Sequence, residues 1–178
     1  MRTHVEIDPP AGFISLEGVM QAAKDYARAI DVEVCAFPQE GLTQVADTDD
    51  FLVEALDRGA RCIGAAPGYD TDHNGQIDRI FELAREYDID IDMHLDFGNT
   101  SDDMDVHYVC DLTEKFGYGG RVAVGHVTKM SMAPPDQIVA ITKRLVDAGV
   151  ALTVLPATDL FLMGRDQDHG VRRGVLPA

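Results

Sequence analysis

The stretch DIDIDMHLDFG, residues 88–98, alternates polar and apolar side chains along a single extended segment. Successive side chains of a strand point to opposite faces, so Ile91, Met93 and Leu95 share one face. The opposite face carries four polar residues, which are Asp90, Asp92, His94 and Asp96. The stretch therefore predicts a buried strand with one apolar face and one polar face.

The polar face of this strand needs partners, because burying ionised carboxylates without compensation is costly. We expect the aspartates to lie beside a metal ion, a cationic side chain or water. The stretch by itself does not choose among the three.

The rest of the chain repeats a strand followed by a helix. Short β-type runs begin roughly 30 residues apart, the length of one strand–helix unit. Segments with helical periodicity separate them, such as residues 134–149, which open on two prolines and stop at Gly149. This alternation predicts an α/β fold with a parallel sheet covered by helices, and functional residues at the carboxyl ends of the strands.

Two architectures fit that alternation, an open doubly wound sheet and a (β/α)8 TIM barrel. Residues 2–8 and 31–39 also gather polar side chains on one face. Strands of an open sheet are apolar on both faces, whereas the inner face of a barrel can turn polar near its rim, so the pattern favours the barrel. A typical barrel has eight strands and about 250 residues. We therefore expect residues 1–178 to form one domain that is a partial barrel, with an open-sheet relative as the alternative.

The composition disfavours several classes of partner. The formal net charge of −16 disfavours nucleic acid and anionic membranes, because the summed field repels phosphate. The three cysteines, Cys35, Cys62 and Cys110, form no CxxC motif, which is typical of reduced intracellular thiols. The first residues lack the apolar run of a signal peptide, and no run approaches membrane-spanning length. We expect a cytoplasmic protein that binds a small molecule.

Two histidines lie near the ends of consecutive predicted strands, His94 in the opening stretch and His126 in VAVGHVT. Side chains that point inward at the carboxyl rim of neighbouring strands come within reach of one ion. Imidazole nitrogen suits zinc and iron, and carboxylates complete such sites. Two hydrogen-bonded interior histidines would give the same pattern, and the spacing leaves both interpretations open.

Six motifs along the chain bear a family resemblance. They are MRTHVEID (1–8), AFPQEG (36–41), IDIDMHLD (89–96), GRVAVGHVT (120–128), FLMGR (161–165) and RRG (172–174). In this order and spacing they resemble the cytosine deaminase branch of the amidohydrolase superfamily, which includes the N-isopropylammelide amidohydrolases. The resemblance implies a metal-dependent hydrolase on a (β/α)8 barrel, with the six strand–helix units of this chain at barrel strands 2–7. One zinc or iron ion would activate water, which attacks a ring carbon of a small nitrogen heterocycle and expels ammonia or an amine.

The resemblance also implies roles for individual residues. His94 corresponds to a metal ligand, and His126 corresponds to the histidine that sits beside the metal-bound hydroxide and polarises the substrate. Gln39 corresponds to the amide that pairs with the substrate ring, and Asp92 to a residue that orients a metal ligand. Asp159 follows the last predicted strand, where it either contacts the substrate or caps a helix.

Two features depart from the family pattern. Where these deaminases place a proton-shuttling glutamate, three residues after the histidine, this chain has Phe97. Asp96 is the nearest carboxylate, and we predict that it substitutes as a catalytic residue. The paired H-x-H ligands of the first barrel strand and the aspartate ligand of the last have no counterpart here. We therefore expect a fragment of a longer barrel, and the alternative function is a catalytically silent chain that folds with a partner or as a homo-oligomer.

The segment DTDHNGQID, residues 70–78, copies the first nine positions of a calcium loop. Its twelfth position is Phe81 instead of the required glutamate. We therefore predict a turn followed by a helix cap.

Overall fold

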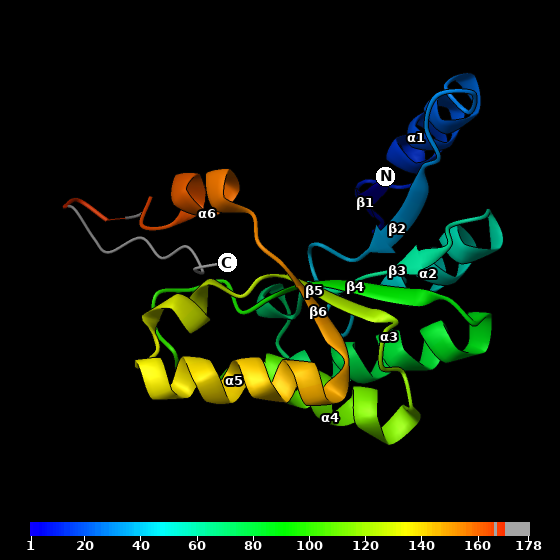
Figure 1. Cartoon of the computed structure of the whole chain (residues 1–178). Helices are drawn as coiled ribbons and strands as arrows, with labels where there is room; N and C mark the ends of the chain where they lie inside the picture. Colours follow the sequence, from blue (N-terminus) through cyan, green and yellow to red (C-terminus); the bar gives the residue numbers. More distant parts are fainter. Residues whose placement is uncertain (166, 170–178) are drawn as a thin grey trace. The chain divides into compact units, whose positions relative to one another are not determined.

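The computed structural model describes residues 1–165 and 167–169, so the RRG motif lies outside the described residues. Within these described residues, six strands alternate with helices, and every strand register that the structure gives is parallel (Figure 1). The predicted α/β class is confirmed. The chain divides into two compact units, Met1–Met93 and His94–Ala178. The single domain expected from the sequence stays a prediction, and each unit is described by itself.

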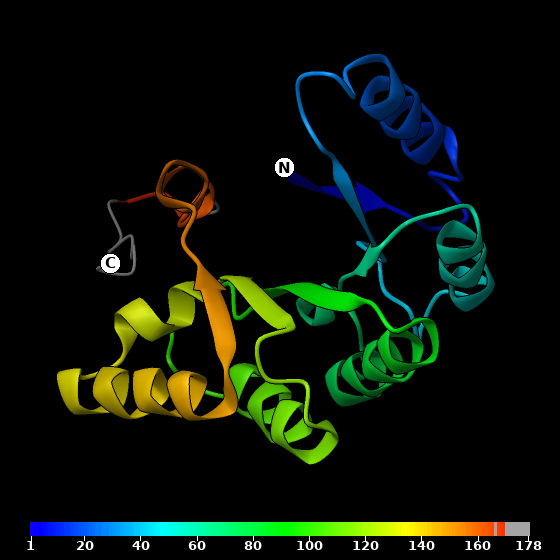
Figure 2. The same cartoon turned by 45° about the vertical axis from the view of Figure 1, so that its right-hand side comes forward.

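The first unit contains three strand–helix repeats and most of a fourth strand. Its elements are β1 (Arg2–Glu6), α1 (Ile14–Asp25), β2 (Glu33–Phe37), α2 (Thr48–Asp57), β3 (Cys62–Ile63), the 3-10 helix η1 (Pro67–Tyr69), α3 (His73–Tyr87) and β4 (Asp90–Leu95), which continues into the second unit. The strands are neighbours in chain order, and Arg2 lies opposite Glu33 in the register of β1 and β2. In Figure 2 the three helices lie on one side of these strands.

The strand β4 has the two faces that its alternation predicts. Ile91 and Met93 are fully buried, and Leu95 is 1% exposed. Close approach of β3 to this strand requires a glycine, because a Cβ at Gly64 would lie 2.4 Å from the carbonyl oxygen of Asp92. The apolar face of β4 is thus part of the core.

On the polar face of β1 to β4, one guanidinium contacts three carboxylates and offsets part of their charge. Arg2 lies 2.6 Å from Glu33, 3.1 Å from Asp92 and 3.6 Å from Asp90. Nε2 of His4 lies 3.5 Å from a carboxylate oxygen of Asp92. Burial opposes ionisation of Asp92, but the contacts with His4 and Arg2 outweigh it and lower its pKa. Of the three partners left open by the sequence, the structure shows a cationic side chain at this face.

The segment that resembles a calcium loop is a turn and a helix cap, as predicted. Asp72 caps α3 by accepting a hydrogen bond from the backbone N–H of Gly75, at 2.9 Å. Asp70 is buried and accepts hydrogen bonds from the backbone N–H groups of Leu42 and Thr43, at 2.6 and 2.8 Å. The side chain of Gln76 donates to the same carboxylate, at 2.8 Å. Asp70 therefore ties the loop after β2 to the start of α3.

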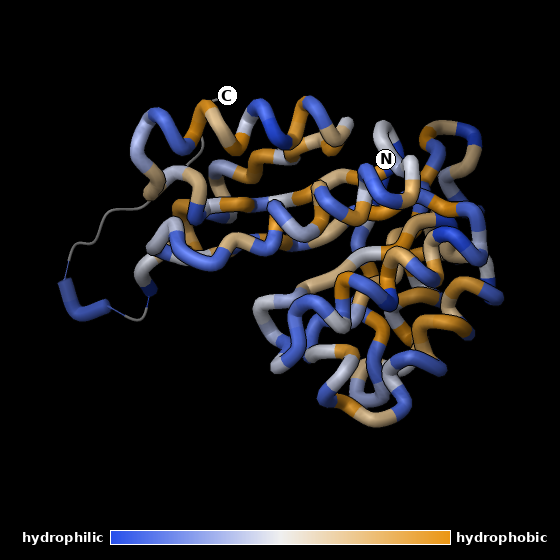
Figure 3. The backbone as a smooth tube through the Cα atoms, turned by 90° about the horizontal axis from the view of Figure 1, so that it is seen from below, coloured by the Kyte–Doolittle hydropathy of each residue, from blue (hydrophilic) through white to orange (hydrophobic). Residues whose placement is uncertain are grey.

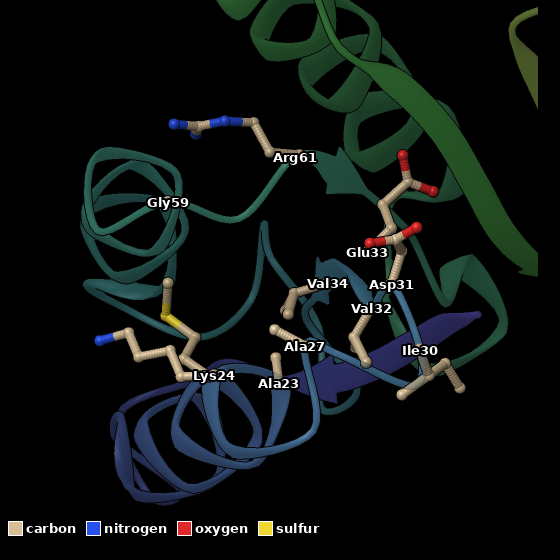
Figure 4. A pocket seen from close by; sticks show the side chains of 11 residues that line it. Ala23, Lys24, Ala27, Ile30, Asp31, Val32, Glu33, Val34, Gly59 and Arg61 are labelled. Atoms are coloured by element: carbon tan, nitrogen blue, oxygen red, sulfur yellow. The ribbon is translucent and has the colours of Figure 1, made fainter.

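A pocket of about 340 Å³ lies in this unit, beside α1 and before β2 and β3 (Figure 4). Its wall is largely apolar, with Lys24, Arg61 and Glu33 among the polar residues. Residues at the amino ends of these strands line the pocket, whereas Gln39 follows the carboxyl end of β2. The pocket therefore lies away from the end of the strands where the sequence predicts function.

The second unit continues the alternation from the end of β4. Its elements are α4 (Val106–Phe116), β5 (Val122–His126), the 3-10 helix η2 (Thr128–Met132), α5 (Pro135–Ala148), β6 (Val150–Thr153) and α6 (Pro156–Leu162). The strands β5 and β6 pair in parallel, and α4 and α5 lie on the same side of them in Figures 1 and 2. The helix α5 follows Pro134 and ends before Gly149 at φ +70°, as its sequence predicts.

Hydrophobic and hydrophilic segments alternate along the helices in Figure 3, as expected when one helix face packs on a sheet. Among the described residues, none of the helices combines the length and the apolar character needed to cross a bilayer.

We predict that Asp70→Asn lowers the free energy of unfolding by about 2–4 kcal/mol at neutral pH, because several hydrogen bonds to an ionised group are lost or weakened. Burial alone would raise the pKa of Asp70, but the hydrogen bonds from Thr43, Leu42 and Gln76 hold it well below its ordinary value. The ionised carboxylate therefore stabilises the fold above about pH 4, and this contribution is lost as the pH falls toward the depressed pKa.

Urea unfolding at a series of pH values measures this contribution. The difference between wild type and Asp70→Asn should shrink as the pH falls below about 4. The control Asp50→Asn, at an exposed position of α2, should change stability by less than about 1 kcal/mol. A difference at Asp70 that does not depend on pH would contradict the prediction.

Candidate active site at the carboxyl ends of β4 and β5

The structure brings His94 and His126 together, as the sequence predicted. Their ring centroids are 5.3 Å apart and the ring planes are inclined by 46°. His94 lies near the end of β4 and His126 is the last residue of β5. The backbone N–H of Val127 donates to the carbonyl of Leu95 at 3.0 Å, which ties the two strand ends together. The two rings are therefore neighbours at the carboxyl ends of β4 and β5, within the second unit.

The backbone at His126 and Val127 is strained. Both residues have positive φ, +69° and +45°, a region that non-glycine residues rarely occupy and β-branched residues occupy least. Val127 is fully buried, so it cannot relax into solvent. Strain of this kind is held in place by surrounding structure and clusters at functional sites.

His126 is paired with a buried carboxylate from α6. Its Nδ1 lies 2.7 Å from Oδ1 of Asp159, and Asp159 is only 1% exposed. A carboxylate in its ionised form only accepts hydrogen bonds, so a hydrogen bond to it would require the proton of a neutral His126 on Nδ1. The other nitrogen, Nε2, is then left to bind a proton, an ion or a substrate atom. The second oxygen of Asp159, Oδ2, is buried and has no hydrogen-bond partner among the described residues.

Phe97 borders the same histidine. Its ring meets His126 edge-on, with centroids 5.7 Å apart and an interplanar angle of 83°, and 44% of the residue is exposed. The position at which the family resemblance implies a glutamate thus presents an apolar wall to His126. An exposed aromatic ring beside an imidazole suits a flat, apolar-faced ligand.

Asp96 has a structural task in addition to its predicted catalytic one. Its two carboxylate oxygens accept hydrogen bonds from the backbone N–H groups of Asp105 and Val106, at 2.8 and 2.9 Å. These donors lie at the start of α4, so Asp96 caps that helix from a distance. Burial raises the pKa of Asp96 to about 6, although the two hydrogen bonds act in the opposite direction. Its substitution for the glutamate stays a prediction.

The two remaining predicted residues lie in the first unit. Asp92 makes its contacts with Arg2 and His4, as described above. Gln39 is half-buried in the loop that follows β2. The roles predicted for Asp92 in orienting a metal ligand and for Gln39 in pairing with the substrate stay predictions.

The Asp159–His126 pair is the feature that sequence reasoning missed. Asp159 was expected either to contact the substrate or to cap a helix, and its pairing with a histidine 33 residues earlier was not foreseen. The signal was available, because β5 and β6 are neighbours and residues that follow neighbouring strands lie at the same edge of a sheet.

The described residues do not form a complete metal site. They contain no group of three or more histidine, cysteine or acidic side chains placed to hold an ion. Zinc sites in proteins have about four ligands, of which His94 and His126 supply two at most. The donor type fits zinc or iron, but the number of donors does not.

These features define a class of protein: an α/β chain whose parallel strands place paired imidazoles, one backed by a carboxylate, at their carboxyl ends. No protein-family model matches the chain. It is 30% identical over 151 residues to N-isopropylammelide isopropyl amidohydrolase of Pseudomonas sp. (strain ADP), which covers 84% of this chain and 38% of that protein. It is 23% identical to pterin deaminase of Rhizobium rhizogenes over 98% of this chain and 40% of that protein.

The fold matches a solved structure over nearly its whole length. A crystal structure of 5-methylcytosine deaminase from Klebsiella pneumoniae, with 5-fluorocytosine bound, superposes with a TM-score of 0.89 and 24% identity over 98% of this chain and 43% of that one. The predicted resemblance is confirmed: the chain is related to part of the heterocycle amidohydrolases and deaminases of the amidohydrolase superfamily, and its fold is of the TIM-barrel type. The chain spans about two-fifths of the length of these relatives.

We predict that Asp96→Asn lowers the free energy of unfolding by about 1–3 kcal/mol, because asparagine offers one acceptor oxygen to the two N–H groups of α4. Asparagine tolerates the positive φ of Asp96, +51°, so the loss reports the hydrogen bond rather than the backbone. Urea unfolding at neutral pH measures the change. The control Asp102→Asn, at an exposed neighbour, should stay within about 0.5 kcal/mol. If Asp96→Asn were as stable as wild type, the capping role of Asp96 would be contradicted. The catalytic role predicted from the sequence would then be the remaining one.

Proposed function

We propose that this chain carries part of the active site of a hydrolase that cleaves a C–N bond of a small nitrogen heterocycle. The observation that carries the proposal is the cluster of His94, His126 and Asp159 at the strand ends, in a chain related to amidohydrolases and deaminases. Triazine-like, cytosine-like and pterin-like rings are the substrate candidates, because the relatives are named for such compounds.

In the proposed reaction, water adds to a ring carbon, and ammonia or an amine departs from that carbon. The attacking water loses a proton and the departing nitrogen gains one. His126 serves both transfers through Nε2, since its Nδ1 is held by Asp159 at 2.7 Å. The nearby carboxylate stabilises the imidazolium that exists between the two transfers. The exposed ring of Phe97 contributes an apolar wall for the substrate.

We further propose that His94 contributes to binding one zinc or iron ion, with His126 beside the ion and its Nε2 left uncoordinated for the proton transfers. An ion bound there would supply an activated water. The described residues do not complete such a site, and the proton transfers assigned to His126 do not depend on it.

We predict that His126→Ala lowers kcat/KM for C–N hydrolysis by about 100-fold or more, the usual contribution of a positioned acid–base group. The assay supplies the chain with zinc or iron(II) and cytosine, N-isopropylammelide or pterin, and measures released ammonia or isopropylamine. The matched control is His107→Ala, an exposed histidine on α4, which should stay within about twofold of wild type.

Binding of the same heterocycles is measured in parallel by perturbation of histidine side-chain NMR signals. Signals of His94 and His126 should shift on addition of substrate, and those of His107 should not. A chain that neither releases an amine nor shows these shifts would overturn the proposed function.

A further inference from the structure

Asp159 combines three properties that together give it a defined role. It is 1% exposed, one carboxylate oxygen is bonded to Nδ1 of His126, and the other oxygen has no partner among the described residues. Burying an ionised carboxylate with one oxygen unpaired is costly. An arrangement with such a cost is expected where it serves the site rather than the fold alone.

The contact with Asp159 decides which nitrogen of His126 is available. A free neutral imidazole interconverts between two tautomers, with the proton on Nδ1 or on Nε2. A carboxylate that accepts from Nδ1 selects the first tautomer, which leaves a lone pair on Nε2. The carboxylate thereby removes one of the two states that His126 would otherwise populate.

Other contacts restrict the orientation of the same ring. The backbone of His126 and Val127 is held at positive φ, and the N–H of Val127 is bonded to the carbonyls of Leu95 and Gly125, at 3.0 and 3.1 Å. The ring of Phe97 meets His126 edge-on, at 5.7 Å between centroids. The backbone, one aromatic ring and one carboxylate thus converge on a single imidazole.

We infer that Asp159 is a positioning residue that locks His126 in the Nδ1–H tautomer and aims Nε2 at the reacting centre, rather than a residue that contacts the substrate itself. This inference rests on the proposed function for its catalytic consequence, but the tautomer is a property of the chain alone. The sequence left two roles open for Asp159, contact with the substrate or capping of a helix. The geometry points instead to action through His126.

The tautomer can be measured directly by long-range proton–nitrogen NMR of the chain labelled with [15N]histidine, under mildly alkaline conditions where imidazole is neutral. His126 should show a protonated Nδ1 and an unprotonated Nε2 in wild type. Asp159→Ala should move His126 toward the Nε2–H tautomer that free imidazole prefers. Asp159→Asn should keep the wild-type tautomer, because its amide oxygen still accepts from Nδ1.

The chain offers a matched control in a second histidine–aspartate pair. Nδ1 of His169 lies 2.8 Å from Asp168, but both side chains are largely exposed. We expect His169 to show the tautomer mixture of a free imidazole, and Asp168→Ala to leave the signals of His126 and the activity unchanged. A role of Asp159 limited to supporting α6 would lower the melting temperature of Asp159→Ala without moving the tautomer of His126.

Kinetics separate positioning from substrate contact. If Asp159 acts through His126, Asp159→Ala should lower kcat by about 100-fold with KM within about threefold, and Asp159→Asn should recover part of the loss. A rise in KM at unchanged kcat, or a wild-type His126 that populates both tautomers, would overturn the inference. A locked tautomer in a chain without turnover would uphold the positioning role and reject the proposed function, so the two failures are distinguishable.

Discussion

The stability of the polar face of the first unit depends on one cationic side chain that is surrounded by carboxylates. Arg2 contacts Glu33 on β2 and both Asp90 and Asp92 on β4. A guanidinium can do this because its planar fork presents several N–H donors to more than one acceptor and stays charged when partly buried. Without it, parallel strands with acidic residues on one face would carry uncompensated charge into the sheet. The acidic row is therefore a structural feature near the starts of the strands, and only its end carries candidate chemistry.

The carboxyl ends of β4 and β5 follow a different physical rule. There the backbone enters positive φ at Asp96, His126 and Val127, and the buried carboxylate of Asp159 is bonded to an imidazole through one oxygen. Natural chains break local rules of this kind where function requires a fixed geometry. The strained backbone at His126 carries a ring that is contacted by Phe97 and hydrogen-bonded to Asp159. The strain is therefore associated with a fixed ring orientation. In the second unit, backbone strain that lowers the stability of the fold accompanies the fixed orientation of one imidazole.

Residues 88–98 were sufficient to predict the faces of β4, since alternation along a strand is a local property. The same parity, with the order of the strands, predicted that His94 and His126 would meet. What local patterns could not supply was the path of the chain after each strand. The loop after β4 returns to place the start of α4 on Asp96, and α6 turns back to place Asp159 on His126. Local patterns also could not predict that Arg2 is the partner of Asp92, because 90 residues separate them in the sequence.

The exchange of an acidic residue for Phe97 changes how protons can move in this site. A carboxylate three residues after His94 would be the natural shuttle in the family that this chain resembles, and Phe97 has no proton to give. Asp96, the adjacent carboxylate, has both oxygens engaged by α4, so its use would weaken that helix start. His126 is paired with a buried carboxylate through Nδ1, which leaves its Nε2 for the proton transfers of the proposed reaction. In the proposed reaction such a site would move protons by imidazole, and its efficiency would then depend on how firmly one ring is held.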